Sequence, residues 1–281
     1  MHAVTRFAPS PTGRLHLGHA YSALLAHDFA RKEGGAFLLR IEDIDPGRTR
    51  SEHVNGIIED LLWLGLEWDG QMIYQSERLP LYAEALERLK GEGLVYPCTC
   101  TRAEIAAEIA ASALAPQGPD GPIYPGTCRG VGDTSKPHCW RLDVAEAMAR
   151  AGPLYWLDDH TEVQAEPERF GDVVLARKDA PASYHLAVTL DDAAQGVTDV
   201  IRGRDLYAAT DVHRLLQALL DLPTPVYRHH GLLTDASGER LAKRHGAPSL
   251  ADLREGGADP VALVAGLRRV ELPSGYSLAQ A

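Results

Sequence analysis

Apolar residues near the N-terminus follow two spacings, one typical of buried strands and one typical of helices. Val4 to Phe7 predicts a short strand, and the apolar run from Ala36 to Ile41 predicts a second. Between these runs, five apolar residues recur at helical spacing: Leu17, Tyr21, Leu24, Leu25 and Phe29. This spacing predicts a helix that begins near His16. Strand, helix and strand in succession favour an α/β fold with a parallel sheet and helices on its faces.

The alternation continues and is then interrupted by a stretch of different character. Amphipathic helices are predicted over 54–62 and 79–89, where apolar side chains recur every three or four residues. Residues 95–170 instead combine a C-x-C pair, an alanine-rich helix over 102–113 and a loop rich in Pro and Gly over 115–137. This composition predicts an insertion with a small fold of its own.

Strand and helix patterns return after the insertion. Buried strands are predicted at 172–177, 184–188 and 199–204, and a helix follows from Val212 to Leu220. After Pro223 we expect a strand, a loop and helices near Leu250 and after Pro260. The predicted domains are 1–94 and 171–222 as two halves of a Rossmann-type catalytic domain, 95–170 as the insertion, and 223–281 as a short, mainly helical C-terminal region.

Composition narrows the class of protein. The 281 residues are enough for two domains, with 45% hydrophobic and 24% charged residues, as in ordinary globular enzymes. The net charge of -11 argues against binding of nucleic acid by bulk electrostatics, so an RNA partner would need a local basic face. Four cysteines suit a reduced compartment and a metal site. Without an apolar leader or membrane-length apolar run, we expect a cytoplasmic protein with no membrane contact and no obligate protein partner.

The stretch from Arg6 to His19, R-F-A-P-S-P-T-G-R-L-H-L-G-H, has the character of a nucleotide-binding junction. A strand that passes through a stiff loop into a helix directs backbone N–H groups and the positive helix end toward an anion. His16 and His19 add donors for oxygens that gain charge in a phosphoryl displacement, and Gly18 leaves room for a flat ring. An isolated H-x-x-H pair is more often structural, but the preceding residues make that alternative improbable.

This stretch resembles the ATP-binding signature of class I aminoacyl-tRNA synthetases in its glutamate-type form. A second stretch, Gly238 to Arg244, resembles the lysine-rich second signature of that family, with Lys243 matching the catalytic lysine. Arg240 stands where that signature usually opens with lysine, and Ala242 replaces its usual serine. Read alone, this basic loop would be a solvated surface turn. The resemblance implies three catalytic residues, His16, His19 and Lys243, and binding of ATP with Mg²⁺ by Pro9, Gly18, Arg240 and Lys243.

Groups suited to an amino acid with two carboxylates stand at predicted strand ends. Arg6 and Arg202 can form forked bonds to carboxylates, Glu42 can accept the ammonium group, and Tyr184 offers a hydroxyl and an apolar wall. Each residue taken singly is also compatible with a surface ion pair or a core position. The resemblance implies L-glutamate as the amino acid, bound by Arg6, Phe7, Ala8, Ser10, Glu42, Tyr184 and Arg202.

The insertion carries three cysteines with metal-ligand spacing: Cys98, Cys100 and Cys128. They predict a closed structural zinc site, one ion per chain, that still needs a fourth ligand. Residue chemistry alone favours Cys139 or His138. The resemblance points instead to Tyr124, because Y-P-G-T-C over 124–128 is similar to the Y-x-x-x-C of a short glutamate-type relative. The alternative is three incidental buried cysteines.

The sequence continues only briefly after Lys243, whereas full glutamyl-tRNA synthetases continue into helical anticodon-binding domains. The resemblance is therefore nearest to a short form that activates glutamate with ATP without tRNA. That form transfers the glutamate to the queuosine base in the anticodon of tRNA(Asp). The alternatives are a minimal enzyme that charges the 3′ end of tRNA(Glu), a nucleotidyltransferase of the same superfamily, and a non-catalytic RNA-binding module.

Overall fold

The computed structural model describes residues 2–111, 116–235 and 248–279. Along these residues, no helix has both the length and the apolar character that crossing a membrane requires.

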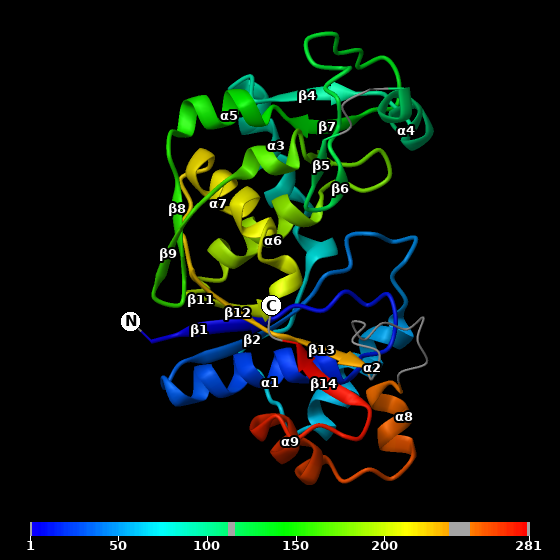
Figure 1. Cartoon of the computed structure of the whole chain (residues 1–281), viewed down its shortest axis with the longest axis vertical. Coiled ribbons are helices and arrows are strands. Elements are labelled where there is room, and N and C mark those ends of the chain that lie inside the picture. Colours follow the sequence, from blue (N-terminus) through cyan, green and yellow to red (C-terminus); the bar gives the residue numbers. More distant parts are fainter. Residues whose placement is uncertain (1, 112–115, 236–247, 280–281) are drawn as a thin grey trace. The chain divides into compact units, whose positions relative to one another are not determined.

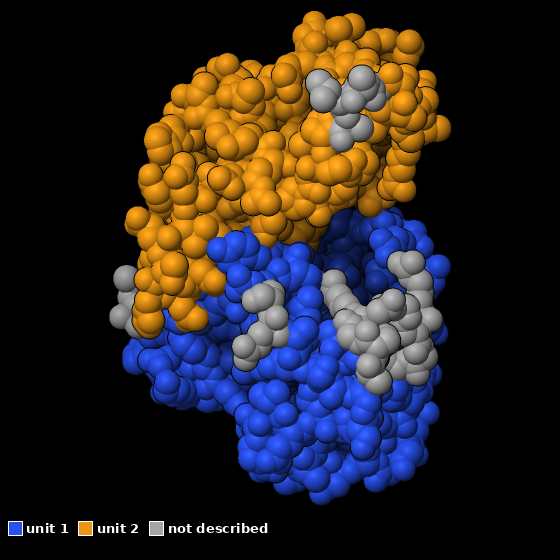
Figure 2. All heavy atoms as spheres, in the orientation of Figure 1, with its two compact units in different colours: residues 1–77, 196–207, 225–281 blue, residues 78–195, 208–224 orange. Residues whose placement is uncertain are grey.

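The chain forms two compact units, which Figure 2 distinguishes by colour. Unit 1 comprises Met1–Glu77, Gly196–Tyr207 and Pro225–Ala281, and unit 2 comprises Arg78–Gln195 and Ala208–Thr224. The chain therefore leaves each unit and returns to it. The four-part division based on the sequence stays a prediction.

A parallel sheet forms the centre of unit 1. Strands β1 (Val4–Phe7), β2 (Ala36–Ile41) and β3 (Ile73–Tyr74) pair in that order, all parallel. After a long excursion the chain returns with β11 (Asp199–Gly203) and β12 (Val226–His230), which are also parallel to each other. The N–H of Thr198 donates to the carbonyl of Val4 at 2.9 Å, so β11 begins beside β1. The predicted parallel sheet of an α/β fold is confirmed.

Helices and an antiparallel strand pair complete unit 1 (Figure 1). These elements are α1 (Leu17–Lys32), α2 (Ser51–Trp63), α8 (Leu250–Glu255), α9 (Pro260–Arg269), β13 (Leu232–Asp235), β14 (Tyr276–Ala279) and the 3-10 turns η1 (Gln75–Arg78, which runs one residue past the end of the unit) and η3 (Arg204–Leu206). In β2, Phe37, Leu39 and Ile41 are completely buried and pack with apolar residues of α1 and α2. Burial of this alternating face fixes the register of the strand.

Unit 2 combines a small antiparallel sheet with helices. Its sheet has the order β10 (Val174–Ala176), β7 (Cys139–Leu142), β4 (Val95–Cys98). The remaining elements are the helices α3 (Leu79–Gly91), α4 (Arg102–Ala111), α5 (Val144–Ala151), α6 (Tyr184–Ala194) and α7 (Ala209–Leu219), the 3-10 turn η2 (Pro167–Phe170), and two hairpins, β5 (Gln117–Gly118) with β6 (Gly121–Pro122) and β8 (Tyr155–Asp158) with β9 (Thr161–Gln164).

The predicted strand over 184–188 is wrong, because these residues form the first turns of α6. The Ser183 side chain caps the helix by accepting the N–H of Leu186 at 3.5 Å. Residues 186–192 are all buried, so the helix is surrounded and shows no polar face. A short run of apolar residues does not distinguish a buried strand from a buried helix, which explains the error.

Candidate functional site

The two histidines of the first signature cap helix α1. His16 is the N-cap residue, and its Nδ1 accepts the backbone N–H of Gly18 at 3.1 Å. In return, His19 Nδ1 accepts the backbone N–H of His16 at 3.1 Å. The ring centroids lie 3.8 Å apart. A neutral imidazole that accepts at Nδ1 carries its proton at Nε2, so each ring presents an Nε2–H donor.

Gly18 leaves room for the first imidazole. A Cβ at this position would lie 3.0 Å from Cε1 and 3.1 Å from Nδ1 of His16. A side chain at this position would therefore need the capping ring to shift by a few tenths of an ångström. The structure thus gives the glycine a role that the sequence did not suggest, since space for a nucleotide ring was the expected reason.

Three of the predicted glutamate-binding residues lie at or just beyond the carboxyl ends of the parallel strands of unit 1. Arg6 and Arg202 are buried, on β1 and β11. Glu42 directly follows β2, and its N–H donates to the carbonyl of Pro9 at 3.1 Å. Arg202 donates through Nε to His229 Nε2 at 3.2 Å and through Nη2 to the carbonyl of Leu206 at 3.1 Å. Ligands bind at this edge of open α/β sheets.

The loop between β1 and α1 carries the other predicted residues of this edge. Phe7 and Pro9 are buried, Ala8 is half-buried and Ser10 is exposed, with its carbonyl accepting the N–H of Thr12 at 2.9 Å. Arg240 and Lys243 lie outside the described residues, so their predicted contact with ATP stays a prediction.

Arg40 is a candidate that the sequence reasoning missed. It is completely buried in β2, and its Nη2 lies 3.5 Å from Glu42 Oε1. A guanidinium in this position restrains the carboxylate of Glu42, which is predicted to accept an ammonium group. The signal was present in the sequence, because a charged residue inside an apolar strand run needs a partner.

Tyr184 belongs to unit 2, where it begins α6. Its side chain is exposed, and its ring makes edge contacts with His185 at 5.6 Å and His213 at 5.5 Å between centroids. The two imidazoles approach each other through His185 Nδ1 and His213 Nε2 at 3.2 Å. Tyr184 therefore stands on a small aromatic group of its own unit.

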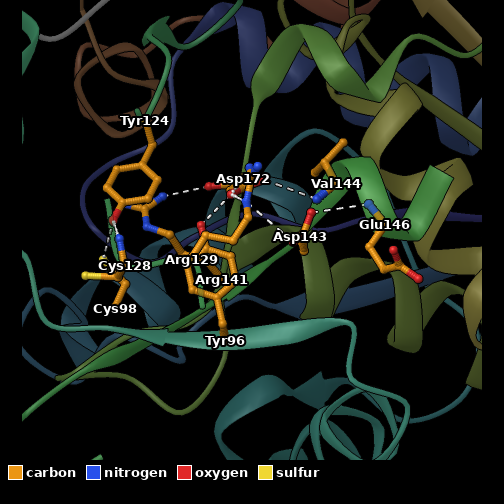
Figure 3. Close-up of polar contacts among 10 residues, drawn as sticks. All are labelled: Tyr96, Cys98, Tyr124, Cys128, Arg129, Arg141, Asp143, Val144, Glu146 and Asp172. Atoms are coloured by element: carbon orange, nitrogen blue, oxygen red, sulfur yellow. Dashed lines mark hydrogen bonds and ion pairs between the residues drawn. The ribbon is translucent and has the colours of Figure 1, made fainter. Parts of the chain in front are cut away.

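The insertion cysteines come together in unit 2. The sulfurs of Cys98, Cys100 and Cys128 all lie within 4.8 Å of one another. The Tyr124 hydroxyl joins them, at 3.3 Å from the sulfur of Cys98 and 3.6 Å from that of Cys100. It also accepts the backbone N–H of Cys128 at 3.0 Å, as Figure 3 shows. Three sulfurs and one oxygen in this arrangement form a donor set that suits a tetrahedral zinc ion.

The two alternative fourth ligands lie elsewhere. Cys139 directs its sulfur to the carbonyl of Cys98 at 3.5 Å, and His138 Nδ1 is 2.8 Å from the carbonyl of Lys136. Among the described residues, neither joins the group of three sulfurs. The geometry therefore favours Tyr124 over both.

The surroundings shift the pKa values of Cys128 and Cys100 in opposite directions. Burial acts to raise the pKa of Cys128, but hydrogen bonds involving Tyr124 and the backbone of Thr99 outweigh it and lower that pKa to about 6. Burial raises the pKa of Cys100 to about 11. Cys128 is thus more ready than Cys100 to carry negative charge, and a bound metal ion would favour the thiolate form of each ligand.

Comparison with known proteins leads to the same family that the stretch from Arg6 to His19 resembles. The family described as tRNA synthetases class I (E and Q), catalytic domain, matches residues 2–277. The glutamyl-Q tRNA(Asp) synthetase of Rhodobacter capsulatus is 52% identical over 272 residues, which cover 92% of this chain and 96% of that protein. The protein of the same name from Deinococcus radiodurans is 48% identical over 93% of this chain and 86% of its own length.

A solved structure shows the same fold in a longer protein. The glutamate tRNA ligase of Elizabethkingia meningosepticum, in complex with its amino acid, superposes with a TM-score of 0.77 at 26% identity. The match covers 96% of this chain but only 61% of that ligase. The chain therefore belongs to the class I aminoacyl-tRNA synthetases of the glutamate and glutamine type and, within them, to the glutamyl-Q tRNA(Asp) synthetase family.

Proposed function

We propose that this protein activates L-glutamate with ATP in the absence of tRNA and then transfers the glutamate to the queuosine base in the anticodon of tRNA(Asp). It would act in the cytoplasm, where these substrates occur. The observation that carries the proposal is the 52% identity to a glutamyl-Q tRNA(Asp) synthetase across 96% of that enzyme's length. The histidine caps and the charged strand ends of unit 1 supply the groups that the chemistry needs.

In the first step, the glutamate α-carboxylate attacks the α-phosphate of ATP, and pyrophosphate leaves with the electrons of the broken P–O bond. His16 and His19 would donate from Nε2 to phosphate oxygens, and Lys243 would neutralise charge on the leaving group. Mg²⁺ would accompany the triphosphate. The enzyme needs no covalent nucleophile, because alignment and charge stabilisation lower the barrier of such a displacement.

Selection of glutamate follows from the strand ends. Arg6 and Arg202 would hold the two carboxylates, and Glu42, fixed by Arg40, would accept the ammonium group. Phe7, Ala8 and Ser10 would line the same pocket, and Tyr184 would contribute its hydroxyl. In the second step, an acceptor group on queuosine attacks the activated carbonyl, and AMP leaves.

The cysteine cluster of unit 2 fits one structural zinc ion, held by Cys98, Cys100, Cys128 and Tyr124. Four protein donors leave no open position for substrate, so the ion would stabilise the fold of this part of the chain and take no part in the reaction. The burial of Cys98 and Tyr124, the partial burial of Cys100 and Cys128, and the shared hydrogen bonds support this assignment.

A second candidate is a minimal glutamyl-tRNA synthetase, favoured by the structural likeness to a glutamate tRNA ligase. Labelled glutamate separates the two functions. We expect label on tRNA(Asp) whose 3′-terminal hydroxyls have been removed, and none on tRNA from cells that cannot make queuosine. Label on tRNA(Glu) that disappears when its 3′ end is blocked would support the second candidate instead. Pyrophosphate exchange into ATP that depends on glutamate but not on tRNA would confirm the activation step.

A further inference from the structure

Arg141 stacks on the tyrosine of the cysteine cluster. It lies in β7, the central strand of the small sheet of unit 2, opposite Tyr96 of β4 and Val174 of β10. Its guanidinium carbon stands 3.9 Å from the centroid of the Tyr124 ring. Figure 3 shows Arg141 between this ring and the polar group around Asp172.

The Nη1 atom of Arg141 makes a hydrogen bond and its Nε atom does not. Nη1 donates to the backbone carbonyl of Asp172 at 2.7 Å. That residue is itself fixed, because its side chain accepts from Tyr96, from Arg129 and from the N–H of Val144. By contrast, Nε of Arg141 is buried and makes no hydrogen bond. Leaving a charged donor buried without a hydrogen bond is unfavourable, so another interaction must offset it.

The contact with Tyr124 can offset that cost. A cation over an aromatic face is attracted by the electrons of the ring, and the same contact fixes the plane of the ring. The oxygen at the far end of that ring is the atom that meets the sulfurs of Cys98 and Cys100. A donor set with three thiolates and an oxygen carries more negative charge than one divalent cation cancels, and Arg141 is a permanent positive charge beside it.

We infer that Arg141 is a positioning residue for the metal site: its guanidinium, anchored on the Asp172 carbonyl, holds the Tyr124 ring so that the hydroxyl completes the donor set. This inference rests on the proposed zinc site. Residues behind the direct ligands commonly change metal affinity by about 10–100-fold when they are replaced.

The first experiment measures zinc affinity by competition with a chromophoric chelator. Arg141→Met keeps an unbranched apolar stem and removes the cation, so affinity should fall about 10–100-fold. Arg141→Lys keeps the charge without the flat stacking surface, so its zinc affinity should lie between those of wild type and Arg141→Met. Arg150→Met, on the exposed face of α5 where Arg150 pairs with Glu92 at 2.7 Å, is the matched control and should leave affinity unchanged.

A double-mutant cycle distinguishes positioning from a general effect on the sheet. Tyr124→Phe keeps the ring and removes the oxygen, so adding Arg141→Met should cost little further affinity. Equal losses in both backgrounds, or unchanged affinity in Arg141→Met, would overturn the inference while leaving the zinc site itself standing. A wild-type protein that binds no zinc would overturn the site and the inference together. Metal-free melting curves of each variant show whether it still folds.

Discussion

The start of α1 in unit 1 and the cysteine cluster in unit 2 are both compact polar sites, but contacts of very different sequence range hold them together. At α1, every cap bond joins residues no more than three positions apart, from His16 to His19. The cluster joins Cys98 to Cys128 through the Tyr124 hydroxyl. The ring of Tyr124 packs against Arg141, which is held by the backbone carbonyl of Asp172. The caps of the first site need only one short stretch of sequence. The second site forms only after segments that are far apart in the sequence have packed together.

This difference suggests how each site should respond to change. The fold of a site built by local caps tolerates remote substitutions, and its activity falls when a group that acts on the substrate is altered, whether that group is near or far in sequence. A site built from distant segments needs the packing around it, and a bound ion would stabilise that packing.

The largest effect is expected at the ATP-binding region. Lys243→Ala should slow glutamate-dependent pyrophosphate exchange by about 10²–10³-fold, mainly in kcat, because a donor to the transition state is lost while ground-state binding remains. Steady-state exchange measures both constants. Lys32→Ala, in the exposed last turn of α1, is the control. Turnover close to wild type in Lys243→Ala would remove this lysine from the mechanism.

The next test addresses the long-range site. Cys100→Ser should lower zinc affinity at least about 10-fold, and each tenfold loss removes about 1.4 kcal/mol of metal-linked stability. Elemental analysis and melting with and without chelator give the two quantities. Cys139→Ser should keep about one zinc per chain, because its sulfur faces a backbone carbonyl. If Cys139→Ser lost the metal and Tyr124→Phe retained it, the fourth ligand would have to be reassigned.

The smallest effect concerns Asp60, a buried acid of α2 in unit 1. Burial raises the pKa of Asp60 from 3.8 to about 6, although Arg254 Nη2 lies 3.5 Å away. Because the folded pKa exceeds the unfolded one, this stabilising contribution is complete below about pH 4 and disappears as the pH rises through 6. Relative to Asp60→Asn, the wild type should therefore lose about 2 kcal/mol between pH 4 and 7.

Urea unfolding of both proteins across that range measures the difference in unfolding free energy. Glu59→Gln is the control, because it alters an exposed neighbour that also pairs with Arg254 but keeps Asp60. The difference in unfolding free energy between wild type and Glu59→Gln should show no comparable trend with pH. A difference between wild type and Asp60→Asn that stays constant with pH would mean that Asp60 titrates normally.

Sequence reasoning succeeded where local pattern decides the structure. The strands β1 and β2 and the start of α1 near His16 all follow from apolar spacing and a turn signal, and the structure confirms them. It failed at α6, because Leu186, Ala187 and Val188 are apolar in succession and only the surrounding helices decide between strand and helix. Tertiary packing, which a single sequence does not display, settled that segment.

The same limit applies to the sites. Cys98, Cys100 and Cys128 could be grouped from spacing, but residue chemistry alone favoured Cys139 or His138 as their companion. A tyrosine became the favoured donor only through family resemblance and then through geometry. Arg141 carried no sequence signal, because its relevance depends on strand pairing that brings β7 beneath the Tyr124 ring.

The segment that carries Lys243 is attached at both ends to unit 1. On one side it follows β13, which pairs with β14. On the other side, the N–H of Leu250 donates to the carbonyl of Leu15 at 2.8 Å, and Ser249 forms an isolated antiparallel β-bridge with His16. Under the proposed function, a lysine whose segment is joined to unit 1 at both ends would meet the triphosphate at an effective concentration in the millimolar range or above. Much of the translational entropy of bringing this charge to the nucleotide would then be lost once, during folding, and not in every catalytic cycle.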